Sequence, residues 1–524
     1  MRKYEPFIDG EPFAWSGPSV DSVDPSTSAV SSQIARCTET EADLEMRSAD
    51  RAFREDAWAD AATHADILGA LADTLAVNWE SLVRSKIHNN GKRIAEVRAQ
   101  FSGLRSWYRH FADEARKLRV EPQDISIPGA HSAAHPQADG VVVAITPYNS
   151  PLMILAWKLA PALPAGNAVV VKSSEMASAS TLEFVRLAHQ SGLPASVLNV
   201  VTGFGHEAGE ALVRHPLTRK VTFTGSDGGG RKIAEAAADR VVPTTLELGG
   251  KSAQVVFADC DLENAVNGVF SGIFLSNGQT CVAGSQLIVV ASIHGAFVTR
   301  IEERAASLQM GDAMNPSTQV APLANKPHLA KVTAMITQTK DEDATCLLDG
   351  LATAARRDGF YVGPTIFDDV TYDMQLWREG VFGPALAVTA FNTEAEAIEL
   401  ANDSDYGLAG GVWTTDTDKA AWVAKAIHSG TIYINHYRSV NPSGPNGGIK
   451  LSGYGRELDP DAVKDFLQIN QSGPAQIQCP TLSPDLPRIH MTTQISTSKR
   501  NSEDSIGGPH ERDIPATRRQ FPRP

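Results

Sequence analysis

One cysteine in this chain of 524 residues stands where its sulfur could react. Cys281 ends the segment Asn277-Gly278-Gln279-Thr280-Cys281, which follows an apolar run over 269–275 that predicts a helix. A buried cysteine usually packs as a small inert hydrophobe, whereas small polar flanks leave a thiol open to a reactant. The thiolate is the nucleophile, and a nearby base or an electropositive setting favours it. Considered alone, this segment fits a structural cysteine at least as well.

Two further side chains are of the types that assist a nucleophile. Glu247, in Leu246-Glu247-Leu248-Gly249-Gly250-Lys251, is a candidate general base. Asn149, in Thr146-Pro147-Tyr148-Asn149-Ser150-Pro151, carries an amide that can donate to an oxyanion. Local sequence also allows the plainer alternatives, a buried satisfied carboxylate for Glu247 and a turn residue for Asn149.

Glycine clusters and a charged pair follow three predicted strands. The run 224–230, which contains Gly225 and Ser226, separates a predicted strand from a predicted helix, an arrangement that can bind a pyrophosphate. A second cluster contains Gly203 and Gly205, and plain turns explain either cluster equally well. Lys172 and Glu175 follow another strand and could hold ribose hydroxyls, or form a solvated surface pair.

The elements that must position these residues alternate in type. Apolar runs at 141–145, 167–172, 198–201 and 220–224 predict strands, and 152–163, 181–191, 206–215 and 231–238 predict helices. Almost wholly apolar strands between helices indicate a parallel sheet covered on both faces. Such sheets bind ligands at the carboxyl ends of their strands.

The remainder of the chain divides by composition. Residues 1–40 predict short strands and turns, 41–119 amphipathic helices and 120–140 a polar extended arm. A second α/β region spans about 251–451, with a helix predicted over 391–401 and a strand over 410–413. The last part, 473–524, is rich in Pro, Ser, Thr and Arg and poor in large apolar residues, which predicts disorder.

Bulk properties exclude several function classes. A formal net charge of −14 argues against non-specific binding to nucleic acid or to an anionic membrane. The longest apolar stretch, 141–171, is interrupted by prolines and a lysine and predicts no membrane span. Five scattered cysteines fit neither a disulfide framework nor a metal site, so we expect a reducing, cytoplasmic location and no bound metal.

In combination, these segments resemble the aldehyde dehydrogenase superfamily of the NAD(P)-dependent, non-acylating type. The resemblance covers about residues 7–467 and depends on motifs that occur in the family's order and separation. The motifs begin at Thr146, Lys172, Phe223, Glu247, Gly278, Phe382 (Phe-Gly-Pro) and Gly447 (Gly-Gly-Ile-Lys-Leu-Ser-Gly).

The resemblance implies an α/β fold with a Rossmann-like nucleotide-binding domain, a second α/β catalytic domain and a small bridging β-arm. The implied boundaries are 1–119 and 141–250 for the dinucleotide-binding domain and 251–459 for the catalytic domain. The arm would contain 120–140 and 460–472 and would support a homodimer or homotetramer. However, Ile469 to Pro474 looks like a poor strand because glycine and proline end it early, which places oligomer assembly in doubt.

The resemblance also implies roles for single residues. Cys281 would attack the aldehyde carbonyl to form a thiohemiacetal, Asn149 would hold the oxyanion, and Glu247 would activate the water that hydrolyses the later thioester. The cofactor, NAD with NADP also possible, would contact Thr146, Lys172, Glu175, Gly225, Ser226, Gly249 and Phe382. A carboxylate at Glu175 favours NAD, because it would repel a 2′-phosphate.

Several positions depart from the family pattern. Gly380 occupies the place of a glutamate that would bind the nicotinamide ribose, so we expect looser cofactor placement. Ser150 and Asn446 are polar where relatives line the substrate tunnel with larger or aromatic groups, which favours a polar or semialdehyde-like aldehyde. Trp157 would be an apolar wall of the tunnel or a core residue.

Two alternatives to this assignment remain at this stage. A coenzyme-A-acylating semialdehyde dehydrogenase would form the same thioester but pass it to a thiol, and Glu247 argues against that reaction. A degenerate, non-catalytic family member would explain Gly380 and the altered C-terminus, whereas Cys281, Glu247 and Asn149 oppose it.

Overall fold

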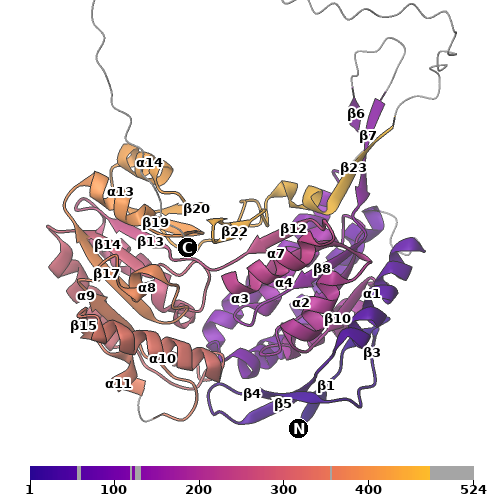
Figure 1. Cartoon of the computed structure of the whole chain (residues 1–524), viewed down its shortest axis with the longest axis horizontal. Coiled ribbons are helices and arrows are strands. Elements are labelled where there is room, and N and C mark those ends of the chain that lie inside the picture. The colour runs from indigo at the N-terminus through magenta and orange to yellow at the C-terminus, as the bar shows by residue number, and fades with distance from the viewer. Residues whose placement is uncertain (56–60, 119–120, 124–131, 355–356, 473–524) are drawn as a thin grey trace, which may run out of the picture.

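Two large β-sheets organise the chain, and helices cover both of them (Figure 1). The computed structural model describes residues 1–55, 61–118, 121–123, 132–354 and 357–472. The first sheet has the strand order β22-β12-β11-β8-β9-β10-β2-β3, and the second has the order β15-β16-β17-β14-β13-β19-β20. A three-stranded arm, β23-β7-β6, projects from the body. The predicted fold class, two α/β sheets with a small β-arm, is confirmed.

The first sheet is parallel through its centre. Its inner strands are β8 (Val141–Ile145), β9 (Ala168–Lys172), β10 (Leu198–Val201), β11 (Thr218–Thr224) and β12 (Thr244–Glu247). They are almost wholly buried because helices cover both faces, which is why β8, β9 and β10 are mostly apolar in sequence. The edges are β2 (Phe7–Ile8) with β3 (Glu11–Pro12), and β22 (Gly453–Tyr454).

Strand β22 departs from the predicted division of the chain. It lies within 251–459, the range assigned to the catalytic domain, yet Gly453 pairs with Glu247 and Tyr454 with Leu246 of the first sheet. The chain can return this closely because residue 453 is a glycine, whose added Cβ would lie 1.9 Å from the Leu246 oxygen. After the second sheet is complete, the chain therefore returns to the first sheet through β22.

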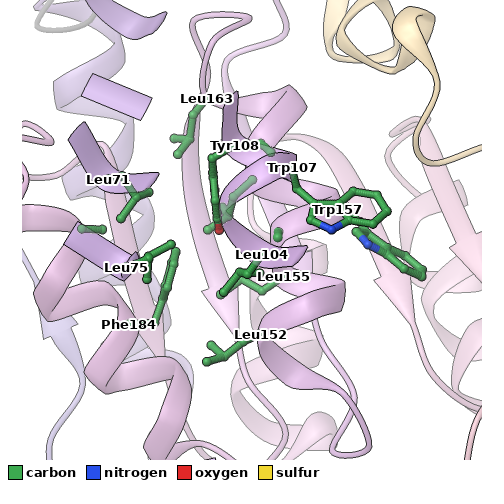
Figure 2. Close-up of a cluster of buried hydrophobic side chains, with 14 of the residues drawn as sticks. Leu71, Leu75, Leu104, Trp107, Tyr108, Leu152, Leu155, Trp157, Leu163 and Phe184 are labelled. Carbon is green, nitrogen blue, oxygen red and sulfur yellow. The ribbon is translucent and has the colours of Figure 1, made fainter. Parts of the chain in front are cut away.

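Helices from three parts of the chain pack around the first sheet. They are α1 (Glu39–Arg54), α2 (Ala61–Asn90), α3 (Ile94–Ala115), α4 (Pro151–Ala162), α5 (Ala179–Gln190), α6 (Glu210–Arg214) and α7 (Asp227–Ala238). Figure 2 shows the core between α2, α3, α4 and α5, where Leu71, Leu104, Leu155 and Phe184 are almost inaccessible to solvent. Each such side chain stabilises the fold by about 1.5–3 kcal/mol.

Two predicted helices begin at other residues than expected. The helix predicted over 206–215 starts as a π-helical turn, Gly205–Gly209, and continues as α6. The helix predicted over 231–238 already begins at Asp227, because Ser226 Oγ accepts a hydrogen bond from Gly229 N at 3.1 Å and caps it. The glycines 228–230 therefore form the first turn of α7 instead of a free loop.

The second sheet is also mainly parallel. It contains β13 (Ala253–Val256), β14 (Gln286–Val290), β15 (Thr345–Leu348), β16 (Thr365–Asp368), β17 (Ala385–Phe391), β19 (Ala409–Trp413) and β20 (Thr431–Ile434). Its helices are α8 (Leu262–Phe274), α9 (His294–Ala306), α10 (Lys326–Asp341), α11 (Gly350–Ala354), α12 (Gln375–Arg378), α13 (Glu394–Asn402) and α14 (Thr417–Ala426). The helix predicted over 391–401 is wrong at its start, since Phe391 ends β17 and Thr393 caps α13 through Glu396 N.

The arm contains β6 (Glu121–Gln123), β7 (Ser132–Ala138) and β23 (Leu467–Ser472). The prediction of a poor strand from Ile469 is wrong, because β23 pairs with β7 over its whole length, from Leu467 with Ala138 to Ser472 with Ala133. The polar residues of β23 are compatible with a strand because most of its side chains face solvent. The predicted disordered tail, 473–524, lies outside the described residues.

Smaller elements complete the fold. The strands β1 (Arg2–Tyr4), β4 (Ser19–Val23) and β5 (Val30–Ala35) form one sheet, and β18 (Tyr406–Gly407) pairs with β21 (Ile449–Lys450). Short 3₁₀ helices occur at Leu275–Gly278 and Pro460–Phe466. Among the described helices, none combines the length and the apolar character that crossing a membrane requires.

Candidate active site

A cavity of about 630 Å³ collects many of the residues predicted to do chemistry. Loops at the carboxyl ends of β8, β11 and β12 form one side of it. The turn before β14, the segment before β17, helix α10 and residues at β18 and after β21 complete it. The predicted residues in its wall are Asn149, Gly225, Ser226, Gly249, Cys281 and Phe382. Thr146, Lys172, Glu175, Glu247, Ser150, Trp157 and Asn446 lie outside this wall.

The backbone ahead of Cys281 adopts an unusual conformation. Ser276, Asn277 and Gly278 have φ values of 57°, 50° and 68°, so three consecutive residues are left-handed. A Cβ added at Gly278 would lie 2.0 Å from the Gly383 oxygen, so a side chain there would collide with the Phe-Gly-Pro segment. This tight packing places Cys281 directly beside the segment that contains Phe382.

Polar contacts hold the strained turn in place. The Glu96 carboxylate accepts hydrogen bonds from Ser276 N at 2.8 Å and Ser276 Oγ at 3.0 Å. Asn277 Nδ2 donates to the Ala321 oxygen, and Gln279 Oε1 accepts from Ala324 N at 2.9 Å. A non-glycine residue held left-handed costs about 1–3 kcal/mol, which such contacts must offset. Glu96 was not recognised from the sequence, because a glutamate on an amphipathic helix carries no signal of this contact.

The Cys281 thiol holds its proton in the free protein. Burial, and after it the negative charge of Glu247, raise the pKa of Cys281 to about 11. The backbone N–H groups of Val282 and Cys281 and the Arg438 guanidinium act in the opposite direction on this pKa. Because the thiol is protonated at neutral pH, nucleophilic attack by this sulfur requires a base that removes the proton.

Asn149 is buried and held from both sides. Its Nδ2 donates to the Gln279 oxygen at 3.0 Å, which fixes the amide beside the turn that carries Cys281. Asn90 Nδ2 donates to the oxygens of Tyr148 and Asn149, each at 3.2 Å, and so holds the backbone. An amide has two N–H donors, so the second N–H of Asn149 remains for a ligand. Asn90 was not recognised from the sequence, because Asn90-Gly91 has the pattern of an ordinary helix end.

Glu247 is the last residue of β12 and is 5% exposed. Its Oε1 has no hydrogen-bond partner among the described residues. Burial, followed by the negative charge of Glu457, holds the pKa of Glu247 well above its usual range, while Lys158 and Arg456 oppose the shift. A carboxyl group with a raised pKa binds a proton more strongly than an ordinary glutamate does, which suits a general base.

A buried ion pair lies next to this carboxyl group. Lys158 Nζ donates to Glu457 Oε1 at 2.5 Å, to Thr222 Oγ1 at 3.0 Å and to Thr224 Oγ1 at 2.8 Å. Glu457 Oε2 lacks a hydrogen-bond partner in the described part of the chain. The sequence contains a faint signal for this network, since Lys158 interrupts an apolar helix, but Glu457 was missed.

The ends of β8 and β9 carry groups that suit a dinucleotide. Thr146 N donates to the Lys172 oxygen at 3.1 Å, and Lys172 Nζ lies 3.2 Å from Glu175 Oε2. Burial lowers the pKa of Lys172. The buried hydroxyl of Thr146 has no partner among the described residues, so it is available to a ligand at this edge. The sequence-predicted pair therefore forms, and its carboxylate and ammonium fit the hydroxyls of a ribose.

The start of α7 also faces the cavity. Ser226 caps the helix, and the added Cβ of Gly225 would lie 2.4 Å from the Phe223 ring. Gly249 has open space where a Cβ would be. A helix N-terminus in a cavity wall favours a pyrophosphate, so this edge fits a nicotinamide dinucleotide.

Known proteins are similar in sequence to this chain over most of its length. The model of the aldehyde dehydrogenase family matches residues 14–471. The chain is a member of the aldehyde dehydrogenase family. It is 38% identical to aminoaldehyde dehydrogenase 1, peroxisomal, of Pisum sativum, over 89% of this chain and 94% of that protein. It is also 38% identical to hydroxyisobutyraldehyde dehydrogenase of Mycolicibacterium austroafricanum, over 89% and 93%.

A solved structure supports the same membership. The NAD⁺ complex of aldehyde dehydrogenase from Bacillus cereus has a TM-score of 0.88 and 35% identity, over 90% of this chain and 96% of that one. The protein is thus an NAD(P)-dependent aldehyde dehydrogenase, an enzyme that oxidises an aldehyde to a carboxylic acid. Within the described residues, no group of three or more His, Cys, Asp or Glu side chains is placed to hold a metal ion.

An aromatic cluster completes the cavity wall of the dehydrogenase. The rings of Tyr148, His328 and Phe382 lie with centroids 5.7–6.1 Å apart. His328 Nε2 lies 2.7 Å from the Phe382 oxygen, and burial lowers the pKa of His328 to about 4, so the ring is neutral and donates. This contact supports Phe382, whose φ of 56° is left-handed. His328 was not foreseen, because nothing adjacent in the sequence links it to the Phe-Gly-Pro segment.

The three residues predicted to line the substrate tunnel of the dehydrogenase occupy different settings. Ser150 is buried next to Asn149. Trp157 is 5% exposed and packs in the helical core against Trp107, with ring centroids 5.7 Å apart (Figure 2). Asn446 is bonded through its backbone to Glu457, at 2.7 and 2.8 Å. Trp157 is therefore packed as a core residue. Ser150 directly follows Asn149 in the sequence.

Gly380 lines the cavity together with its neighbour Glu379. The Gly380 oxygen accepts a hydrogen bond from Lys331 Nζ at 3.2 Å, and Glu379 Oε1 accepts one from Gln375 Nε2 at 3.1 Å. A Cβ added at residue 380 would lie 3.2 Å from the Gly250 oxygen, a distance that a small backbone shift relieves. A glutamate can therefore be placed there.

We expect Gly380→Glu to tighten NAD about tenfold, since a carboxylate that accepts from ribose hydroxyls adds a charge-assisted hydrogen bond. The rate of NADH formation in a single turnover should rise with it. Equilibrium titration and stopped-flow absorbance measure the two effects. Gly380→Ala adds the Cβ without the carboxylate and is the matched control. Equal behaviour of the two variants would show that the missing carboxylate does not limit cofactor placement.

Proposed function

We propose that Cys281 is the nucleophile of the aldehyde oxidation, Asn149 the oxyanion donor and Glu247 the general base. The single observation that carries this proposal is the cavity in which Cys281 and Asn149 share a wall with Gly225 and Ser226. A reacting carbonyl beside the sulfur would thus also lie beside the edge that suits a dinucleotide. Glu247 is linked to the same place because its negative charge raises the pKa of the Cys281 thiol.

The first step forms a carbon–sulfur bond. Cys281 Sγ attacks the aldehyde carbon while its proton passes to a base, for which Glu247 is the candidate. The carbonyl oxygen becomes an oxyanion, and the second N–H of Asn149 with the backbone N–H of Cys281 donates to it. One donor of this kind typically stabilises the transition state by about 3–4 kcal/mol.

The second step is the oxidation. A planar carbonyl carbon does not release hydride readily, whereas the tetrahedral, electron-rich carbon bonded to Cys281 does. The bound dinucleotide supplies the hydride acceptor. Loss of hydride as the oxyanion reforms a carbonyl leaves a thioester on Cys281.

The third step frees the acid. The proton that Glu247 took from the thiol first passes to solvent. Glu247 then removes a proton from a water molecule, the hydroxide adds to the thioester carbon, and the Cys281 thiolate leaves and regains a proton from Glu247. The open Oε1 of Glu247 is the atom that takes the proton. The buried pair of Lys158 and Glu457 keeps a second carboxylate close to Glu247, which maintains the basicity of that group.

We further propose NAD as the preferred dinucleotide. Glu175 lies in the loop between β9 and α5, and its Oε2 lies 3.2 Å from Lys172 Nζ. Its carboxylate would accept from the adenosine ribose hydroxyls and repel a 2′-phosphate. The relative from Bacillus cereus was solved with NAD⁺, which supports the same choice.

The substrate that we propose is a polar or semialdehyde-like aldehyde. Ser150, adjacent to the proposed oxyanion donor, presents a hydroxyl, and Asn446 supplies a second polar side chain near Glu457. One similar enzyme is described as acting on hydroxyisobutyraldehyde, which carries a hydroxyl group. Trp157 remains the candidate apolar wall.

The experiment that tests the reaction compares two acyl acceptors. Enzyme, NAD and a polar aldehyde are mixed with and without coenzyme A, and the product is identified by mass spectrometry. We expect the free carboxylic acid in both mixtures, at rates equal within about twofold, because Glu247 directs water to the thioester. An acyl-coenzyme A product would instead assign the acylating reaction. Absence of NADH with every aldehyde would contradict the proposed function altogether.

The arm supports the assembly that we propose, a homodimer or homotetramer. Strands β6 and β23 form the two edges of its sheet, and Ile469 on β23 is 63% exposed. An edge strand with an exposed apolar residue is a ready surface for a second copy of the chain. We also propose a cytoplasmic location, which the free thiols of Cys37, Cys260, Cys281 and Cys346 support.

A further inference from the structure

The aromatic wall of the cavity contains a histidine, His328, that the proposed reaction does not use. His328 lies in the first turn of α10, which Asn325 caps by accepting a hydrogen bond from His328 N at 2.9 Å. The cap fixes where the helix begins, and the side chain of His328 lines the cavity together with Tyr148 and Phe382. A polar ring in the otherwise apolar part of a cofactor cavity is a candidate contact for the ligand.

The hydrogen bond of one ring nitrogen fixes the chemistry of the other. Nε2 of His328 lies 2.7 Å from the carbonyl oxygen of Phe382. A carbonyl oxygen only accepts, so Nε2 carries the hydrogen, and in a neutral imidazole Nδ1 is then an acceptor. Burial lowers the pKa of His328 to about 4, so the ring is neutral at physiological pH. His328 therefore carries an unprotonated Nδ1 whose lone pair can accept a hydrogen bond.

Nδ1 of His328 is open to a ligand. Within the described part of the chain, no N–H or O–H group donates to Nδ1, and the atom is not sealed from solvent. His328 as a whole is only 8% exposed and lines the cavity, so the opening beside Nδ1 leads into the cavity. A polar atom at the edge of a cavity gains a partner when a ligand with a suitable donor binds there.

The segment that His328 contacts, residues 380–382, has no side-chain acceptor of its own, since it consists of glycine, valine and phenylalanine. Two side chains one turn apart on α10 hold its backbone. Lys331 Nζ donates to the Gly380 oxygen at 3.2 Å, and His328 donates to the Phe382 oxygen. An ammonium only donates, so of these two side chains only the imidazole can also accept. The acceptor thus lies against the segment where the family pattern has a ribose-binding glutamate.

We propose that His328 Nδ1 accepts a hydrogen bond from a hydroxyl of the nicotinamide ribose, in place of the carboxylate that Gly380 lacks. The proposal rests on the proposed dinucleotide site and deepens it. The nicotinamide half is the one expected here, because Cys281 lines the same cavity and hydride leaves the carbon bonded to its sulfur. A neutral nitrogen forms a weaker hydrogen bond with a hydroxyl than a carboxylate does, which agrees with the gain expected from Gly380→Glu.

Two analogues of NAD test the proposal, one without the 2′-hydroxyl and one without the 3′-hydroxyl of the nicotinamide ribose. Isothermal titration calorimetry gives the Kd of each analogue and of NAD, and the ratio of the two is the discrimination of the enzyme. In the unmodified enzyme at least one analogue should bind about three- to tenfold more weakly than NAD, the usual effect of one hydrogen bond. In His328→Phe the ratio for that analogue should fall close to one, because the acceptor is gone.

A second variant separates contact with the cofactor from support of the backbone. His328→Asn keeps an acceptor near the position of Nδ1 but is too short to donate to the Phe382 oxygen, and it should retain most of the discrimination. If His328 only supported Phe382, the asparagine and phenylalanine variants would lose the discrimination alike, and the proposal would be overturned. The ratio is measured on molecules that bind, so partial unfolding does not alter it, and His328→Leu replaces His328→Phe if the larger ring prevents folding.

The matched control is His428→Phe, the same substitution at an exposed site before β20, which should leave the discrimination unchanged. Equal Kd values for NAD and both analogues in the unmodified enzyme overturn the proposal, and so does discrimination that persists in His328→Phe. Both results leave the dinucleotide site intact, because NAD itself still binds. Absence of NAD binding in the unmodified enzyme would instead contradict the dinucleotide site, and the proposal with it.

Discussion

Replacement of Cys281 by alanine will abolish NADH formation, with a loss of at least about 10⁴-fold in turnover, because no other group can make the aldehyde carbon tetrahedral. Stopped-flow absorbance at saturating NAD and aldehyde measures both the burst and the steady state. The unmodified enzyme should release a burst approaching one NADH per active site, and Cys281→Ala none. A remaining burst in this variant would assign the covalent step to another residue.

The matched control is Cys260→Ala. Cys260 is, like Cys281, a partly buried free thiol, and burial raises its pKa to about 11 as well. It lies just before α8 and packs against the hydrophobic cluster that contains this helix, whereas Cys281 packs against a different cluster. Its replacement should keep the burst within about twofold. If the unmodified enzyme itself gave no burst with any aldehyde, the chain would be a non-catalytic member of its family.

Replacement of Glu247 by glutamine is expected to separate the two halves of the reaction. The burst of NADH should remain largely intact, while steady-state turnover should fall by about 10²–10⁴-fold, the usual contribution of a general base. The thioester on Cys281 then accumulates, and intact-protein mass spectrometry should show one added acyl group. Loss of the burst together with turnover would mean that Glu247 is also indispensable for activation of the thiol.

The pH dependence of steady-state turnover follows from the environment of Glu247. Burial, and then Glu457, raise the pKa of Glu247, so the ionised base is lost as the pH falls through that raised value. Steady-state turnover limited by thioester hydrolysis should therefore rise with pH. In Glu457→Gln one like charge is removed, the pKa of Glu247 falls, and the profile should shift to lower pH. An unchanged profile would exclude Glu247 as the titrating base.

Much of the first sheet could be read from the order of residue types. Strands that are buried on both faces are mostly apolar, so β8, β9 and β10 are visible as short valine-rich runs. The arm was harder, since β23 gains its stability from pairing with β7, more than three hundred residues earlier, rather than from apolar content. The sequence around β23 therefore does not indicate that β7 is its pairing partner.

The sequence by itself determined the family, and it supplied the proposed catalytic residues Asn149, Glu247 and Cys281, because these lie in short segments that can be recognised without the fold. The tertiary structure alone decided the environment of each group. Lys158 and Glu457 meet Glu247, and Lys92 meets Ser150, only after distant elements fold together. The physical reason is that hydrogen bonds and burial depend on three-dimensional neighbours, and these set proton affinities, whereas the chain order records only which groups are present.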